Sequence, residues 1–144
     1  MKKTVAILIL ALTSLNLSAQ AVERNTLMEF KINLTDFKVI QKIEGQDTTI
    51  YGYIYYQNAR YTSISDTELV MLDRKRTNEL IEGFNFLIPK EKTKEITYKL
   101  SFGELINTKY GIYFYSEDNK YTGFSRKRLV KGLTQLEKLK ELID

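Results

Sequence analysis

Between residues 28 and 72, apolar and polar residues alternate in short runs, which is the pattern of half-buried β-strands. The clearest run is Thr48–Tyr56, where β-branched and aromatic residues dominate. Glycine and polar residues separate the runs, as turns require. The pattern predicts strands over Met28–Gly45 (one or two), Thr48–Tyr56, Tyr61–Ile64 and Glu68–Leu72, with turns at 45–47 and 57–58 and a break at 65–66.

The hydrophobic period then changes from two residues to that of a helix. Apolar residues at 80, 81, 84, 87 and 88 follow the spacing of one helical face. Asp73 is a favourable N-cap residue, and Pro89 cannot continue a helix. The sequence therefore predicts an amphipathic helix over Arg74–Ile88, followed by a charged linker at 90–94.

The second half of the chain repeats this plan. Strands are predicted over Ile96–Phe102, Tyr110–Tyr115 and Lys120–Phe124, with a turn at 117–119. Ser125 then caps a second helix, whose buried stripe is Leu129, Leu133, Leu136, Leu139 and Ile143.

The two halves match when residue 73 is aligned with residue 125, an offset of 52 positions. Arg74-Lys75-Arg76 then falls on Arg126-Lys127-Arg128, and Ile81 falls on Leu133. We interpret this match as an internal duplication of a strands-then-helix unit. The alternative is two unrelated helices that each follow a strand, since amphipathic helices resemble one another for physical reasons alone.

The expected fold class is α+β, with antiparallel sheet, two helices on one face, and an internal duplication of a β-β-β-β-α-like unit. The two units, about 28–89 and 95–144, should share one core within a single domain, 22–144. The expected core residues are Ile50, Ile54, Leu80, Ile81, Phe84, Leu87, Leu100, Phe102, Ile112, Phe114, Leu133, Leu136 and Leu139.

From residue 37 to residue 143, the order of elements resembles the tandem β-β-β-β-α plan of the PUR and whirly group of domains. The tract from 71 to 87 also resembles small, uncharacterised exported bacterial proteins with this organisation. Membership of the PUR group would imply binding of single-stranded nucleic acid, but a shared fold does not transfer function. No functional residue is assigned from the resemblance.

The N-terminus has the three parts of a secretory signal peptide. Lys2 and Lys3 precede a short apolar run, which ends in small residues at Ala19-Gln20-Ala21. Cleavage is expected after Ala21, which makes 1–21 a leader and Val22 the new N-terminus; the alternative is cleavage after Ala19, which leaves Gln20 first. A membrane anchor is the alternative, but the run is shorter than the roughly 20 residues that span a bilayer. The mature chain is expected in the periplasm or outside the cell, with no transmembrane span.

Composition excludes several chemistries. The 144 residues include no cysteine and no histidine, which excludes disulfides, thiolate nucleophiles and the commonest general base and metal ligand. Loss of Lys2 and Lys3 takes the 22 basic residues to 20 while all 18 acidic residues stay, so the net charge falls from +4 to +2. Charge and export together argue against nucleic acid as a partner.

Both predicted helices begin with cations, where the helix dipole favours anions. One interpretation is an anion site, in which backbone N–H and guanidinium groups face a phosphate, sulfate or uronate. The other is a solvated basic rim, because exposed charges cost little. The candidate residues are Arg74, Lys75, Arg76, Arg126, Lys127, Arg128 and Lys131.

All ten tyrosines lie between Tyr51 and Tyr121. On the predicted strand 48–56, Tyr51, Tyr53 and Tyr55 should point to one face, opposite the isoleucines. Such a face could stack sugars or bases. It could equally be an exposed sheet face stabilised by cross-strand pairs, and the absence of tryptophan weakens the case for sugars.

Acidic residues near 66–68 and 117–119 do not supply the ligands of a calcium loop, and no nucleophile elbow, P-loop or dinucleotide fingerprint occurs. We therefore expect no metal, no cofactor and no catalytic residue. The sequence favours a non-catalytic exported binding or accessory module, acting on an unknown protein or an anionic envelope ligand. The alternatives are a carboxylate-dependent enzyme on envelope glycans, or an inhibitor or chaperone-like partner of another exported protein.

Overall fold

The computed structural model of the chain describes residues 21–61 and 65–143. The expected leader therefore lies outside the described residues, apart from Ala21. The expected strand Tyr61–Ile64 also lies outside them, except for Tyr61, which belongs to no strand.

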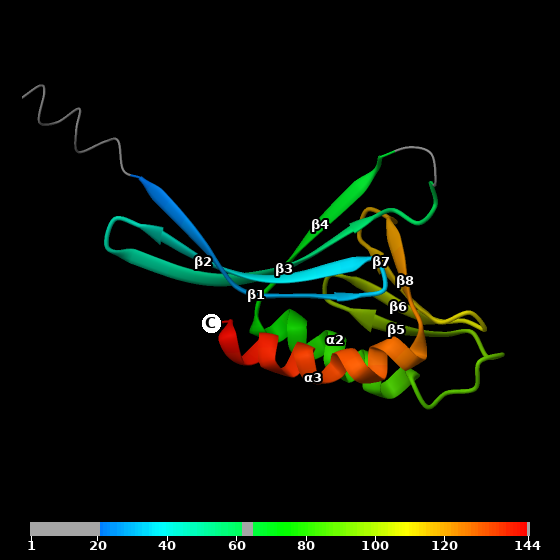
Figure 1. The fold of residues 1–144 in the computed structure, drawn as a ribbon. Coiled ribbons are helices and arrows are strands. Elements are labelled where there is room, and N and C mark those ends of the chain that lie inside the picture. Colours follow the sequence, from blue (N-terminus) through cyan, green and yellow to red (C-terminus); the bar gives the residue numbers. More distant parts are fainter. Residues whose placement is uncertain (1–20, 62–64, 144) are drawn as a thin grey trace, which may run out of the picture.

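Two units of the same plan follow one another along the chain (Figure 1). In each unit, four antiparallel strands pair in sequence order and a helix follows. The first unit contains β1 (Val22–Ile32), β2 (Thr35–Glu44), β3 (Asp47–Gln57), β4 (Thr67–Leu72) and α2 (Arg74–Leu87). The second contains β5 (Ile96–Leu100), β6 (Gly103–Asn107), β7 (Ile112–Ser116), β8 (Tyr121–Phe124) and α3 (Arg126–Leu142). The expected α+β class and its repeated strands-then-helix unit are confirmed.

The two helices begin in the same way. The Asp73 carboxylate accepts a hydrogen bond from the backbone N–H of Arg76 at 2.7 Å, and the Ser125 hydroxyl accepts one from the N–H of Arg128 at 3.4 Å. Both caps have extended backbone conformation, as N-cap residues do. The two expected N-caps are confirmed, at the expected offset of 52 positions.

The helices pack side by side and run in opposite directions. The Arg74 Nε donates to the carbonyl of Ile143 at 3.1 Å, and the Lys140 Nζ lies 3.3 Å from the Asn78 side-chain oxygen. The start of α2 therefore lies beside the end of α3 (Figure 1). This arrangement explains how a basic helix start is tolerated, since it faces the negative end of the neighbouring helix dipole.

Besides packing on each other, the helices contact the sheet of the other unit more than their own: α2 contacts β5, and α3 contacts β1. Glycines mark close approaches between each helix and the opposite sheet. A Cβ atom at Gly83 would lie 2.6 Å from the Leu105 side chain, and one at Gly132 would lie 2.4 Å from Ile32. The two units are thus interlocked through their helices.

A single hydrophobic cluster fills the space between the sheets and the helices. Most of the expected core is buried, while Ile50, Leu100 and Leu133 are partly buried against it. The buried residues that the sequence had not singled out include Ile32, Phe37, Val39, Tyr56, Val70, Leu72, Leu105 and Phe124.

The predicted strand Ile96–Phe102 was wrong in extent. β5 ends at Leu100, residues 101 and 102 form a turn, and the chain returns as β6, which had not been predicted. Phe102 buries its ring in the core from the turn, so the apolar alternation continues past the end of the strand. Gly103 permits the return, with a φ of +153° and no room for a Cβ beside the Tyr115 carbonyl.

Candidate functional site

The two basic tracts do not come together. Because the helices are antiparallel, the tract at the start of α2 and the tract at the start of α3 lie at opposite ends of the helix pair (Figure 1). The Arg76 guanidinium donates to the Met71 carbonyl at 3.0 Å and lies 5.1 Å from the centre of the Phe102 ring. Arg76, like Arg74, therefore uses its guanidinium for contacts within the protein.

Arg126 is also engaged within the protein. Its guanidinium donates to the Asn107 side-chain oxygen and, at 3.0 Å, to the Thr108 carbonyl. The other candidate cations, Lys75, Lys127, Arg128 and Lys131, are exposed. Arg74, Arg76 and Arg126 thus connect the helix starts to neighbouring segments. An anion site at either tract stays a prediction.

The outward face of β3 carries tyrosines as expected. Gly52, Ile54 and Tyr56 are buried, whereas Tyr51, Tyr53 and Tyr55 are half-buried or exposed on the other face. Ion pairs cover the same face nearby, between Lys38 and Glu29 at 3.3 Å and between Lys31 and Asp36 at 3.4 Å.

The strand registers reveal equivalent tyrosines in the second unit. Gly52 pairs with Leu72, which precedes the cap of α2, and Ile112 pairs with Phe124, which precedes the cap of α3. Counting from these positions, Tyr53 corresponds to Tyr113. By the same count Tyr55 corresponds to Tyr115. The internal repeat therefore places tyrosines at matching outward positions of both sheets.

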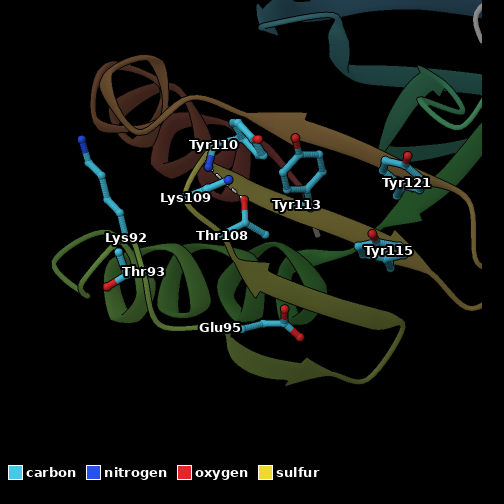
Figure 2. Close-up of a pocket in the computed structure, with 9 residues that line it drawn as sticks. All are labelled: Lys92, Thr93, Glu95, Thr108, Lys109, Tyr110, Tyr113, Tyr115 and Tyr121. Atoms are coloured by element: carbon cyan, nitrogen blue, oxygen red, sulfur yellow. Dashed lines mark hydrogen bonds between the residues drawn. The ribbon is translucent and has the colours of Figure 1, made fainter.

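On the second sheet these tyrosines line a hollow of about 530 Å³, which we name the tyrosine groove (Figure 2). Its floor is the outer face of β7 and β8. The linker after α2 and the loop between β6 and β7 complete its walls. The lining residues are Lys92, Thr93, Glu95, Thr108, Lys109, Tyr110, Tyr113, Tyr115 and Tyr121.

Three of the rings form a cluster. The Tyr115 and Tyr121 rings are stacked, with centroids 4.8 Å apart, and the Tyr113 and Tyr121 rings are tilted at 5.8 Å. Gly123 makes room for this arrangement, since a Cβ there would lie 2.9 Å from the Tyr113 ring. Burial, and then the neighbouring tyrosines, raise the pKa of Tyr115 above its ordinary value, which further favours the protonated hydroxyl that can donate a hydrogen bond.

A second hollow of about 580 Å³ lies between the two units, and we name it the inter-unit slot. A smaller hollow of about 180 Å³ lies between the slot and the tyrosine groove and shares two lining residues with each. The slot is lined by Asn33, Leu34, Gln57, Asn58, Ala59, Tyr61, Thr122 and Gly123. The groove, the smaller hollow and the slot are therefore neighbours.

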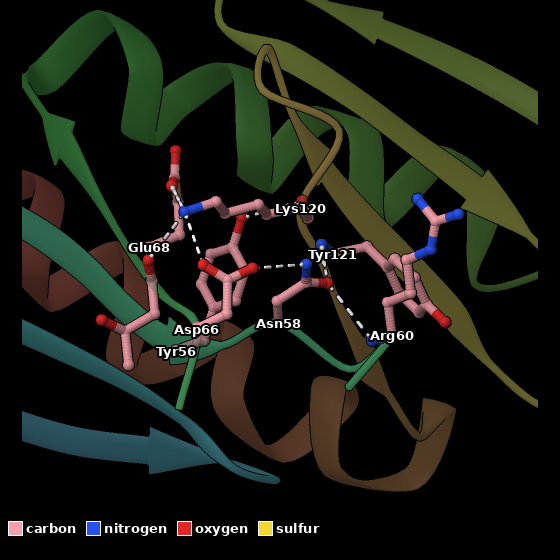
Figure 3. A network of polar contacts seen from close by, with 8 residues as sticks. Tyr56, Asn58, Arg60, Asp66, Glu68, Lys120 and Tyr121 are labelled. Atoms are coloured by element: carbon pink, nitrogen blue, oxygen red, sulfur yellow. Dashed lines mark hydrogen bonds and ion pairs between the residues drawn. The ribbon is translucent and has the colours of Figure 1, made fainter. Parts of the chain in front are cut away.

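A polar network joins the two ends of the β3–β4 connection, near residues 58 and 66, to the start of β8 (Figure 3). The Lys120 Nζ lies 2.9 Å from Asp66 and 3.4 Å from Glu68, which lie before and within β4. The Asn58 side chain donates to Asp66 at 3.0 Å and accepts from the backbone N–H of Tyr121 at 3.3 Å. The network fixes the backbone from which the Tyr121 ring projects into the groove.

The ionisation of the network follows from these contacts. Hydrogen bonds from Asn58 and then from Lys120 hold the pKa of Asp66 below its ordinary value. The hydrogen bond to Asp66 is the largest cause that raises the pKa of Lys120. Both charged forms are stabilised, so the contact is an ion pair at neutral pH.

The described residues offer neither a metal site nor a membrane span. Over residues 21–61 and 65–143, no three acidic side chains converge to hold a metal ion. No helix in the same ranges has the length and apolar character needed to cross a bilayer. The chemistry that the groove presents is aromatic ring faces, hydroxyl groups, two lysines and one carboxylate.

Comparison with protein-family models and with curated proteins finds no match for this chain. Sequence reasoning identified the tyrosine-rich region and named residues of β3, but it missed Tyr110, Tyr113, Tyr115 and Tyr121. The internal repeat was the signal that could have led from Tyr53 and Tyr55 to their counterparts on β7.

Proposed function

We propose that this protein is a non-catalytic, exported binding module that holds its ligand in the tyrosine groove. The observation that supports this most directly is the cluster of Tyr113, Tyr115 and Tyr121 on the outer face of the second sheet. These rings lie outside the hydrophobic core, yet they are gathered around a hollow of the size typical of ligand sites, roughly 300–1,000 Å³. Aromatic side chains with a polar tip are common where proteins bind partners.

The groove favours binding over catalysis. Acid–base catalysis on a glycan by the commonest mechanism uses two carboxyl groups that flank the scissile bond. Among the described residues that line the groove, Glu95 is the single carboxylate. A carboxylate-dependent enzyme is therefore the weaker proposal for this site.

Export is compatible with the fold. β1 begins at Val22, so cleavage after Ala21 or after Ala19 would leave every described strand and helix whole. A binding module outside the inner membrane would meet envelope glycans and other exported proteins, which are the two ligand classes to test.

The test is an array of envelope-type oligosaccharides and peptides, probed with the mature chain, residues 22–144. The groove variant is Tyr113→Leu/Tyr121→Leu. The matched control is Tyr53→Leu/Tyr55→Leu, which removes outward tyrosines from the first sheet. We expect the wild type and the control to bind the same ligands on the array. The groove variant should bind those ligands at least about tenfold more weakly.

Two results would overturn the proposal. In one, the groove variant keeps every feature that the wild type binds, which removes the groove as the site. In the other, the wild type binds no feature at all. Unfolding in urea of all three proteins shows that a loss of binding is not a loss of fold.

A further inference from the structure

We infer that the ligand is a glycan chain of several sugar units, lying along the tyrosine groove and on into the inter-unit slot. This inference rests on the proposed function and names the ligand class and its extent. It follows from three observations: the adjacency of the hollows, the chemistry of their lining, and the closure of the β8 edge.

The row of neighbouring hollows sets the length of the ligand. The small hollow between groove and slot shares Tyr110 and Tyr113 with the groove, and Asn33 and Gly123 with the slot. Groove and slot are each of the size that holds a small molecule, so the hollows together exceed the size of one sugar ring. A chain of repeating units would use all of these hollows.

The lining suits a ligand with apolar faces and polar edges. Along the groove, tyrosines offer ring faces for stacking together with hydroxyl groups for hydrogen bonds. Along the slot, Asn33 and the Gly123 backbone supply polar groups beside Leu34, which is 85% exposed. A sugar ring, with C–H groups on its faces and hydroxyl groups around its rim, matches this alternation.

The charge of the lining does not suit a polyanion. Lys92 and Lys109 line the groove together with Glu95. Lys120, which lies nearby, is already paired with Asp66 and Glu68. Binding of a nucleic acid strand depends on neutralising several phosphates at once, and the described lining lacks the cations for that.

The edge of β8 is closed to an added peptide strand. The Tyr121 carbonyl accepts from the N–H of Ala59 at 2.8 Å, and the Tyr121 N–H donates to the Asn58 side chain. At the other end, the Ser125 N–H donates to the Asn33 side chain at 3.1 Å. The alternation of an antiparallel ladder leaves one rung between them, at Gly123, which is too short for a peptide to extend the sheet.

The experiment compares probes of different class and length on the mature chain by ¹⁵N-resolved NMR titration. The sugar probes are β-1,4-linked hexasaccharides of glucose, N-acetylglucosamine and galacturonate, each with its monosaccharide. The competing probes are an oligothymidylate and a polyproline peptide of similar length. The variants are Tyr113→Leu in the groove, Leu34→Ser at the slot, and Tyr53→Leu as the control.

We expect at least one hexasaccharide to bind roughly tenfold more tightly than its monosaccharide and to perturb amides of both the groove and the slot. Tyr113→Leu should weaken the hexasaccharide about tenfold and Leu34→Ser by a smaller factor, while Tyr53→Leu leaves its affinity unchanged. The galacturonate arm tests the charge argument: this polyanion should bind no more tightly than the neutral hexasaccharides, and binding of galacturonate alone would overturn that argument.

The possible failures are distinguishable. If binding of a hexasaccharide depends on Tyr113 but perturbs no amide of the slot, the claim that the glycan extends into the slot is overturned. Tyr113-dependent binding of the oligonucleotide or the peptide, with no sugar bound, overturns the glycan and leaves the proposed function intact. If no probe depends on Tyr113, the inference and the proposed function both fail.

Discussion

At the scale of single residues, the groove depends on a glycine and a ring that face each other across two strands. Tyr113 pairs with Gly123, and the ring lies where a side chain at 123 would otherwise stand. A Cβ at 123 would be 2.9 Å from the ring edge, closer than carbon atoms normally approach. The ring position is therefore set by the absence of a side chain on the opposite strand.

We predict that Gly123→Ala displaces the Tyr113 ring and lowers the free energy of unfolding by roughly 1–3 kcal/mol, as overpacking does. Urea unfolding and the NMR shifts of the Tyr113 ring measure the two effects. The control is the same substitution in a Tyr113→Ala background, where the cost should shrink because the clash is gone. An equal cost in both backgrounds would contradict this account.

The ion pair in the network predicts a dependence of stability on pH. Because the pKa of Asp66 is lowered by folding, its contribution is fully present above its unfolded pKa of about 4 and is lost as the pH falls through the lower, folded value. We expect Asp66→Asn to be less stable than the wild type at pH 7 and to approach it in acid. Urea midpoints between about pH 7 and pH 3 test this.

The exposed turn residue Glu117 provides the control for that series. Glu117→Gln should run parallel to the wild type over the whole pH range. If Asp66→Asn also runs parallel to the wild type, the ion pair with Lys120 contributes nothing to stability in solution, which is often so for exposed pairs.

At the scale of elements, the two helix caps are equivalent in position but differ in strength. The bond to the Asp73 carboxylate is 2.7 Å, whereas the bond to the Ser125 hydroxyl is 3.4 Å, near the limit for a hydrogen bond. The carboxylate also lies at the positive end of the α2 dipole. The two caps should therefore contribute unequally to stability.

We predict that Asp73→Ala lowers the free energy of unfolding by about 1–2 kcal/mol and that Ser125→Ala lowers it by about 0.5 kcal/mol. Urea unfolding at neutral pH measures both, with the exposed Thr134→Ala in the middle of α3 as the reference. A larger loss for Ser125→Ala than for Asp73→Ala would show that capping geometry does not determine the difference.

The elements that were predictable from sequence are those with a strong local signal. The helix limits came within one residue for α2 because a cap and a proline bracket an amphipathic stretch. β6 was missed because its five residues, Gly103–Asn107, hold two apolar side chains and follow a turn that contains a buried phenylalanine. The first half of β1 was missed because its residues are mostly polar and exposed.

The groove was harder to predict than the elements, for a physical reason. Its lining comes from the linker after α2, the β6–β7 loop and two strands, and the slot adds the turn between β1 and β2. Those segments meet through the packing of whole units, which no local pattern records. The sequence indicated that tyrosine is the distinctive residue type, but the fold determines which tyrosines converge.

At the scale of the whole molecule, the interlocked packing makes each unit depend on the other. The Phe124 ring of β8 lies 5.5 Å from that of Phe84 in α2 and 6.3 Å from that of Phe37 in β2. Gly132 of α3 lies against Ile32 of β1. A four-stranded sheet with one helix would therefore expose the face that the helix of the other unit covers.

We predict that fragments 22–90 and 91–144 do not fold alone and that they regain a cooperative thermal transition when mixed, because each completes the other's core. Circular dichroism of the separate and mixed fragments measures this. The matched control is Gly132→Leu in the second fragment, where the added side chain collides with Ile32 and should abolish the recovery. A cooperative transition in either fragment alone would mean that the repeat is built from two independent domains, and the slot between them would then lose its fixed shape.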